Sequence, residues 1–301
     1  MMKFFSKGFD IERGQYGMRM VLTGAWTDAA RRTLEKRNIV ELELNPAKGW
    51  QRNNLAFLSL LGGLVAFAIV DEKTVDVSPI HALSHLRSLK VLTYCDTPID
   101  FTRFPQLEEV SLEWREGASS LYDCATLRHV FINNCSAKSL DVFHKLNRLE
   151  YLSLKSPRLE MIGNVPTLQS LSFLGVYNAG RLYSLAGVEQ FPNLEMLEIE
   201  RCRKISNIVP VASLRRLQRL MFANCGDIDS LKPVAELKEL REVFFHESTR
   251  IVDGDLTPLK SLPHLEDVSF QERRHYNCGW EDLPMRCSAA ELKKARQMLG
   301  E

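Results

Sequence analysis

The chain has 301 residues, of which 45% are hydrophobic and 26% are charged, and its formal net charge at pH 7 is +1. This charge balance argues against the strongly basic surface of a nucleic-acid-binding protein and against a polyanionic tail. The length and the apolar content are sufficient for a large buried core.

Residues 1–38 are expected to form an N-terminal cap. Thr27–Arg37 predicts a helix, because Thr27 and Asp28 suit its start, good helix formers follow, and Asn38 suits its end. The first ten residues, MMKFFSKGFD, lack the apolar segment of a secretory signal. The seven cysteines are an odd number and are not clustered, so we expect a cytoplasmic protein with reduced thiols.

From residue 39 onwards the chain repeats the phrase apolar-x-x-apolar-x-apolar. Alternate side chains of such a phrase can point into a shared core, so each copy predicts one short strand of a parallel sheet. The steps between first positions run from 18 to 26 residues and average about 22.6. Residues 39–273 are therefore expected to form one repeat domain. The eleven phrases begin at Ile39, Leu64, Leu89, Leu107, Leu127, Leu149, Leu168, Leu194, Leu217, Leu240 and Leu265.

The phrase resembles the strand signature of leucine-rich repeats. Residues 194–270 add the spacing C-x-x-I-x-x-[IL] after Cys202 and Cys225, and they resemble the short repeats of the internalin and phosphatase-regulatory types. Three prolines suit the first position of a short 3₁₀ or α turn between strands, where the missing N–H is no loss, namely Pro210, Pro233 and Pro258. The resemblance implies an α/β leucine-rich repeat solenoid with a curved parallel sheet of about eleven strands, capped at both ends, that binds proteins on its concave face.

The longest apolar stretch is Leu55–Val70. It contains sixteen residues, fewer than the roughly 18 needed to span a membrane, and its second half is itself a repeat phrase. We therefore expect it to be buried in the core and expect no membrane partner.

Residues 274–301 are expected to form a C-terminal cap. Ser288 and Glu291 match a capping box, and an apolar helix face follows at Leu292, Ala295 and Leu299. The stretch Arg273–Pro284 before this helix predicts an irregular loop.

No motif predicts catalysis or a cofactor. The serines and histidines form neither G-x-S-x-G nor H-E-x-x-H, and the pair Cys278 and Cys287 near His275 does not have the spacing of a zinc site. We expect structural roles for the cysteines that occupy the ninth position of their repeats, namely Cys135, Cys202 and Cys225. The chain is therefore predicted to be non-enzymatic, with no metal and no cofactor.

The concave face is where the sequence predicts function. The third, fifth and seventh residues of each phrase point away from the core, and at these positions only Lys155 and Arg219 are basic, which gives a formal charge of −6. This charge predicts repulsion of nucleic acid and attraction of a basic partner. The eight acidic residues are Glu41, Glu43, Glu109, Glu113, Glu198, Glu200, Glu242 and Asp267.

Large apolar and aromatic side chains, Leu174 among them, are also predicted on this face, where they have no core to fill. Aromatic groups surrounded by charge are typical of a protein-binding hot spot. The predicted partner-binding residues are Glu109, Glu113, Trp114, His129, Phe131, Tyr151, Met196, Glu198, Glu200, Arg219, Met221, Glu242, Phe244 and His246.

These observations predict a non-enzymatic scaffold that captures a protein with a basic patch, for example as an inhibitor or immunity protein against a toxin. Three alternatives stay open. The repeats could select substrates for an effector or ligase, or they could form a regulatory subunit that docks on an enzyme. A terminal segment, or a second copy of the chain, could also cover the concave face.

Overall fold

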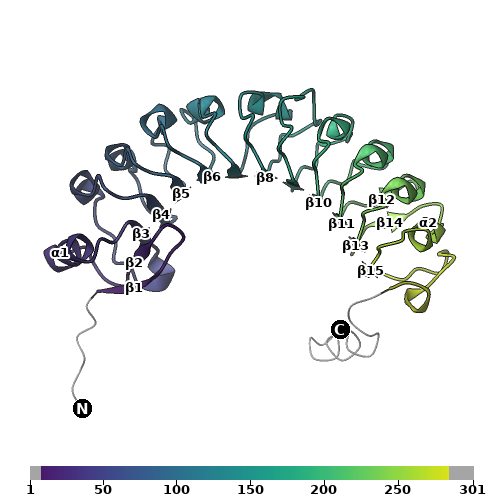
Figure 1. The fold of residues 1–301 in the computed structure, drawn as a ribbon, viewed down its shortest axis with the longest axis horizontal. Coiled ribbons are helices and arrows are strands. Elements are labelled where there is room, and N and C mark those ends of the chain that lie inside the picture. The colour runs from purple at the N-terminus through teal and green to yellow at the C-terminus, as the bar shows by residue number, and fades with distance from the viewer. Residues whose placement is uncertain (1–7, 285–301) are drawn as a thin grey trace, which may run out of the picture. The chain divides into compact units, whose positions relative to one another are not determined.

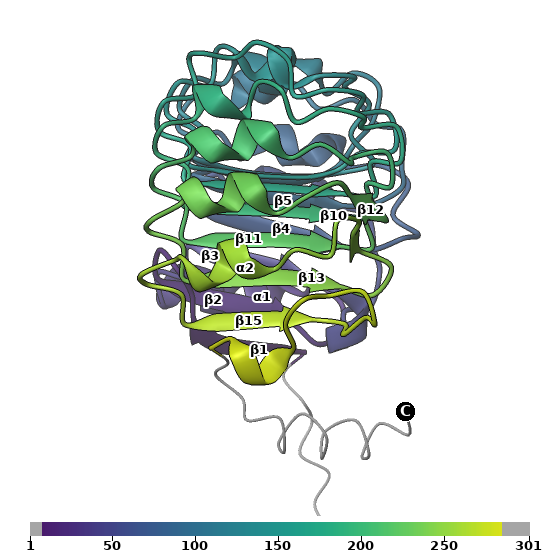
Figure 2. The same cartoon turned by 90° about the vertical axis from the view of Figure 1, so that its right-hand side faces the viewer.

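The computed structural model describes residues 8–284, and the chain divides into two compact units between Asn133 and Asn134. In each unit the strands follow one another in chain order and line one side, while the short helices that connect them lie on the other side (Figure 1). Figure 2 shows neighbouring strands of the second unit running side by side.

The first unit contains seven strands, one α-helix and five short 3₁₀ helices (η) among its described residues. Its strands are β1 (Phe9–Arg13), β2 (Met18–Leu22), β3 (Glu41–Leu44), β4 (Ala66–Val70), β5 (Ser88–Leu92), β6 (Glu109–Glu113) and β7 (His129–Asn133). Its helices are α1 (Asp28–Lys36), η1 (Pro46–Lys48), η2 (Ala56–Leu60), η3 (Ser78–Ala82), η4 (Phe101–Arg103) and η5 (Ser119–Asp123).

The second unit contributes six strands of the same kind and a separate pair of two-residue strands, β12 and β14. Its strands are β8 (Tyr151–Lys155), β9 (Phe173–Tyr177), β10 (Met196–Glu200), β11 (Arg219–Ala223), β12 (Asp227–Ile228), β13 (Glu242–His246), β14 (Arg250–Ile251) and β15 (Asp267–Phe270). Its helices are η6 (Leu140–Phe143), η7 (Val188–Gln190), η8 (Val209–Ser213), η9 (Lys232–Glu236), α2 (Thr257–Lys260) and η10 (Trp280–Asp282).

The core consists of the same three positions in every repeat. Once two of the phrases are shifted to start at Leu86 and Leu171, the first, fourth and sixth residues of each phrase point inward, and in the first ten repeats none is more than 3% exposed. Parallel pairing keeps these positions level from strand to strand; Leu197 of β10, for example, lies opposite Leu220 of β11. The predicted parallel strands are therefore confirmed, and burial of aligned apolar side chains is what holds successive repeats together.

Two repeats have a register different from the predicted one. In β5 the residue level with Val110 is Leu89, so the phrase begins at Leu86. In β9 the residue level with Leu197 is Leu174, so the phrase begins at Leu171. Each prediction was wrong by three residues, because leucines spaced by three allow either start.

The corrected starts make the repeat lengths more even. The steps around β5 become 22 and 21 residues, and those around β9 become 22 and 23. Leu174, which was expected on the concave face, is fully buried. The residues after β7, β9, β10, β11 and β13 all have a left-handed backbone with φ of 55° to 57°, and the one after β9 is Asn178. Asn178 thus takes the same place in its repeat as Asn224 takes in the repeat of β11.

The N-terminal region contains a β-hairpin that the sequence did not predict. β1 pairs antiparallel with β2, and β2 pairs parallel with β3, so two strands precede the first predicted repeat. The predicted helix is present as α1, and the Thr27 hydroxyl accepts a hydrogen bond from the Ala30 N–H at its start.

The short helices predicted at Pro210, Pro233 and Pro258 are present, and each proline is the second residue of its helix rather than the first, where its missing N–H still removes no intrahelical hydrogen bond. The apolar stretch Leu55–Val70 is buried through Leu58 and Ile69, and no helix in residues 8–284 is long and apolar enough to cross a membrane. Residues 273–284 form a loop with the short helix η10. The capping box at Ser288 and the helix expected after it lie outside the described residues.

The register of β9 predicts a large effect for Leu174→Ala. The substitution removes a fully buried side chain and leaves a cavity, so the free energy of unfolding should fall by about 2–5 kcal/mol. Chemical denaturation of purified protein measures this value. Leu60→Ala is the matched control, because Leu60 is 64% exposed and its truncation should change stability by less than about 0.5 kcal/mol. Equal, small effects of the two substitutions would show that the register is wrong.

Candidate functional site

The solvent-facing side of the sheet is formed by the third, fifth and seventh positions of each repeat. We call this side the first-unit face on β3–β7, and the second-unit face on β8–β11, β13 and β15. The register correction replaces Val91, Thr93 and Cys95 by Ser88, Lys90 and Leu92 on the first-unit face. Because Lys90 is added, the formal charge summed over the repeat positions changes from −6 to −5.

The turn of the β1–β2 hairpin covers part of the first-unit face. The Tyr16 N–H donates to Glu41 Oε1 over 2.5 Å, and Arg19 Nη2 lies 2.8 Å from Glu41 Oε2. Glu41 is consequently only 1% exposed, which contradicts its predicted display. Further along, Gln15 Nε2 donates to Glu109 Oε1 over 2.6 Å. Part of this face is thus covered by the N-terminal hairpin of the chain itself. Cover by a terminal segment was one of the alternatives left open by the sequence.

The hairpin turn also carries a cation–π contact. The Arg87 guanidinium lies 4.7 Å from the centre of the Tyr16 ring, and Arg87 pairs with Glu108 at 2.7 Å. Burial and, next, the Glu109 carboxylate raise the pKa of Tyr16 to about 12. The turn is therefore held by several polar contacts rather than by one.

Of the other residues predicted to bind a partner in the first unit, some lie on the strand face and others are buried or lie in a turn. Glu113 is only 6% exposed and accepts a hydrogen bond from Asn133, so it is not displayed as expected. Trp114 follows β6 and stacks on Tyr122 of η5 at 5.3 Å, in the turn rather than on the strand face. His129 Nδ1 lies 3.2 Å from Glu109 Oε1. Phe131 lies opposite Ser111 and is partly exposed.

A hollow occurs over β4, which presents Ala66, Ala68 and Val70 to solvent. Ala66 and Ala68 form its floor, and Glu43 and Lys90 are among the residues around a cavity of about 230 Å³. Glu43 pairs with Lys48 at 2.8 Å. The first-unit face therefore combines a small polar hollow with neutralised carboxylates.

The second-unit face carries a row of polar contacts that crosses four strands. The Tyr177 hydroxyl donates to Glu198 Oε2 over 2.5 Å. Arg219 lies between two carboxylates, 3.3 Å from Glu198 Oε1 through Nε and 3.3 Å from Glu242 Oε2 through Nη1. These side chains stay partly exposed; that of Arg219 is 37% accessible. The row is thus an ordered, charged surface that a partner can reach.

Aromatic side chains lie on both sides of this row. Tyr151 and Phe173 stack with their ring centres 4.1 Å apart, and Tyr151 is 36% exposed. Phe244 stacks on His246 at 5.8 Å, and the Arg219 guanidinium lies 5.0 Å from the centre of the Phe244 ring. Burial lowers the pKa of His246, so this imidazole is neutral at pH 7.

Gly175, in the middle of β9, leaves space for the rings of Phe173 and Tyr177. A Cβ atom at this position would come within 2.7 Å of the Tyr177 ring and 2.9 Å of the Phe173 ring. The absence of a side chain lets both rings lie over the strand. Burial and, next, the hydrogen bond to Glu198 raise the pKa of Tyr177 far above its ordinary value, and burial raises that of Tyr151.

The structure brings all nine predicted partner-binding residues of the second unit onto one face. Glu200, at the end of β10, lies on this face, and its Oε1 is 3.5 Å from Arg201 Nε. Phe173 and Tyr177 were missed, because the wrong register placed Leu174 on the face instead. The uneven steps of 19 and 26 residues around Leu168 were the signal that could have revealed them. The predicted residues that share this face are Tyr151, Met196, Glu198, Glu200, Arg219, Met221, Glu242, Phe244 and His246.

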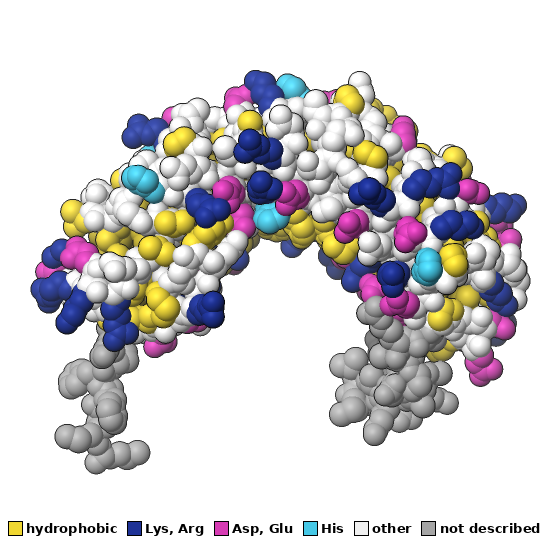
Figure 3. All heavy atoms as spheres, viewed as in Figure 1, with side chains coloured by type: hydrophobic (Ala, Val, Ile, Leu, Met, Phe, Trp, Pro, Cys, Tyr) yellow, Lys and Arg dark blue, Asp and Glu magenta, His cyan; other side chains and the backbone are white. Residues whose placement is uncertain are grey.

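Charges of both signs alternate over the visible surface (Figure 3). Within residues 8–284 no group of three or more His, Cys, Asp or Glu side chains is arranged to hold a metal ion. Cys202 and Cys225 are buried free thiols, and burial raises their pKa to about 12 and about 11. Their thiols point to backbone carbonyls of the strands, the structural role that their position predicts.

The comparisons with known proteins define the fold. An internalin (InlF) of Listeria monocytogenes is 18% identical, with a TM-score of 0.55 over 85% of this chain and 87% of its own. The functional domain of InlJ from Listeria monocytogenes is 13% identical, with a TM-score of 0.51 over 82% of this chain; the chain spans about half, 51%, of that domain. No protein-family model and no curated protein matches the sequence. The chain has the leucine-rich repeat fold.

The hydrogen bond between Tyr177 and Glu198 predicts a pH effect on Tyr177→Phe. A phenol with a raised pKa in the folded state keeps its proton there while the unfolded chain loses it, so stability falls as the pH rises above about 10. Between pH 9 and 11 the wild type should lose more unfolding free energy than Tyr177→Phe, by at most about 1.4 kcal/mol per pH unit. Urea denaturation at each pH tests this, and parallel pH profiles for the two proteins would contradict the contact.

Proposed function

We propose that the protein is a non-enzymatic scaffold whose second-unit face binds a protein partner with a basic patch. The observation that carries the proposal is the row of Tyr177, Glu198, Arg219 and Glu242 with stacked aromatic rings on both sides. Ordered aromatic side chains supply contact area with little loss of conformational entropy. The second-unit face is preferred to the first, because the hairpin turn covers part of the first.

The charge of the second-unit face indicates the charge of the partner surface that it would bind. The strand positions of the second-unit face carry Glu198, Glu200, Glu242 and Asp267 against Lys155 and Arg219, a formal charge of −2. Arg219 already bridges two of the carboxylates, so an incoming Arg or Lys would share these carboxylates with it. Apolar side chains of the partner would pack on the rings. The excess of acid would raise the association rate of a basic protein at low ionic strength.

An inhibitory or immunity role against a basic toxin or nuclease extends this proposal. Stoichiometric inhibition needs a large, preorganised surface and no chemistry of its own, and a repeat scaffold supplies such a surface. We also propose a cytoplasmic location, which is supported by the six described cysteines, all of them free thiols.

Removal of the acidic charge should weaken this interaction. The double variant Glu198→Gln/Glu242→Gln takes the face from −2 to 0 while it keeps amide oxygens near Arg219. The immobilised full chain would first capture partners at two salt concentrations for identification by mass spectrometry. With the purified partner, calorimetry should then show a Kd about tenfold higher for the variant at low salt and a smaller difference at high salt.

The matched control is Glu236→Gln/Glu239→Gln, which removes the same charge from exposed positions in and after η9, on the helix side of the second unit. This control should bind like the wild type. Capture of acidic proteins alone, or equal affinities for the two double variants, would contradict the proposal.

The aromatic anchors can be tested with neighbouring residues of β13. Phe244→Ala should weaken partner binding by about 1–4 kcal/mol and lower the unfolding free energy by only about 1 kcal/mol, since its ring is partly exposed. Phe245→Ala should instead cost about 3–5 kcal/mol of stability, because Phe245 is 1% exposed and points into the core. Calorimetry with the partner and chemical denaturation measure the two quantities. A reversed pattern would show that the faces are assigned wrongly.

A further inference from the structure

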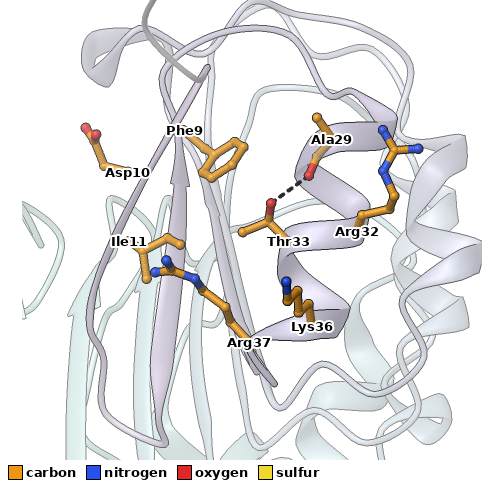
Figure 4. A pocket seen from close by; sticks show the side chains of 8 residues that line it. All are labelled: Phe9, Asp10, Ile11, Ala29, Arg32, Thr33, Lys36 and Arg37. Carbon is orange, nitrogen blue, oxygen red and sulfur yellow. Dashed lines mark hydrogen bonds between the residues drawn. The ribbon is translucent and has the colours of Figure 1, made fainter.

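The N-terminal end of the first unit has an open groove. It lies between β1 and α1, encloses about 830 Å³, and is lined by Phe9 and Ile11 of the strand and by Ala29 and Thr33 of the helix (Figure 4). Phe9 is 8% exposed and forms part of the apolar floor. Asp10 of β1 also lines the groove, and its carboxylate points away from α1 and its basic side chains (Figure 4).

One wall of this groove is a sheet edge without a partner strand in residues 8–284. β1 pairs only with β2. The Gly8 carbonyl accepts from the Thr23 N–H over 2.9 Å, and the Gly14 N–H donates to the Gly17 carbonyl over 2.7 Å. In an antiparallel pair, every second residue directs its N–H and C=O groups to the partner strand. Gly8 and Gly14 face β2, so the N–H and C=O groups of Phe9, Ile11 and Arg13 face the opposite way. These groups point to the open edge, where another strand could bond them.

The other wall is basic. Arg32, Lys36 and Arg37 are exposed on or after α1, and none of them forms an ion pair with any of the residues 8–284. Arg31, on the same helix, is by contrast already paired with Asp28 and Glu35. The groove thus combines an apolar floor, an unpaired strand edge and three cations without counter-ions among the described residues.

We propose that this groove binds an extended acidic peptide segment of another protein, which adds a strand to the edge of β1. Apolar side chains of the peptide would pack on Phe9 and Ile11, and its Asp or Glu residues would pair with Arg32, Lys36 and Arg37. Strand addition supplies affinity through the main chain, and the side pockets supply selectivity. This site shares no residue with the second-unit face. It would bind an acidic segment, whereas the second-unit face is proposed to bind a basic one.

Charge and register favour an external peptide over the chain itself. Residues 1–7 contain two lysines and no acidic residue, and residues 285–301 contain four basic residues against two acidic ones, so neither terminus complements the groove. Two copies of β1 paired antiparallel about Ile11 would place Asp10 opposite Glu12, and such like-charged pairs destabilise a strand pair.

The test uses the full chain and fluorescence anisotropy with a labelled peptide in which every second residue is serine and the residues between are valine and glutamate in turn, so that both kinds of side chain point to the groove from one face of the added strand. Saturable binding is expected, with at least about a tenfold loss when lysine replaces glutamate in the peptide or when alternate peptide amides are N-methylated. Arg32→Glu/Lys36→Glu should also lose at least about tenfold. Its matched control, Arg203→Glu/Lys204→Glu at exposed positions of the second unit, should bind like the wild type.

Ile11→Pro tests the strand edge directly. The Ile11 N–H does not face β2, so proline removes an outward donor and keeps the β1–β2 ladder. Circular dichroism would check folding, and the N-methylated peptide tests the same contact if the variant is unfolded. Binding that survives both changes would overturn the proposal. It would also be overturned if binding appeared only after deletion of residues 1–7, or if light scattering showed a dimer that Ile11→Pro dissociates.

Discussion

The structure depends on one constraint: three apolar positions in each repeat must lie level with the same positions in the next. Leu152, Leu174 and Leu197 illustrate it, because each lies opposite its neighbour and all three are fully buried. A strand that slipped by one residue would turn its core side chains to solvent. Once this alignment is fixed, the alternate strand positions must face outward. The candidate surfaces are therefore a consequence of the core, and an error in the core register becomes an error in the site.

The two faces differ in how the chain itself uses them. On the first unit, the hairpin turn places Tyr16 and Gln15 over Glu41 and Glu109, so the outward carboxylates already have partners. On the second unit, Tyr177 and Arg219 organise Glu198 and Glu242 without burying them fully. The first arrangement stabilises the N-terminal end of the fold. The second leaves an ordered, mostly aromatic and acidic surface within reach of a partner, which is why we locate the proposed function there.

The sequence was sufficient for the repeat architecture, for α1 and for the prolines of the connecting helices, since these follow from periodicity and local propensity. It was insufficient where leucines recur every three residues. The starts at Leu86 or Leu89, and at Leu168 or Leu171, satisfy the phrase equally well, and only the evenness of the steps separates them. As a result Phe173 and Tyr177 were missed, and Lys90 was missed on the first-unit face. The cover over Glu41 could not be predicted, because it depends on contacts of a hairpin turn with residues far along the chain.

The central claim is that the second-unit face is where a basic partner binds. Photo-crosslinking tests it most directly, with a light-activated amino acid placed singly at Met221 on the strand face and at Val209, which is 62% exposed in η8 on the helix side. The account predicts a cross-linked adduct with a basic protein from Met221 and none with that protein from Val209. Adducts from Val209 alone, or an acidic protein joined at Met221, would contradict it.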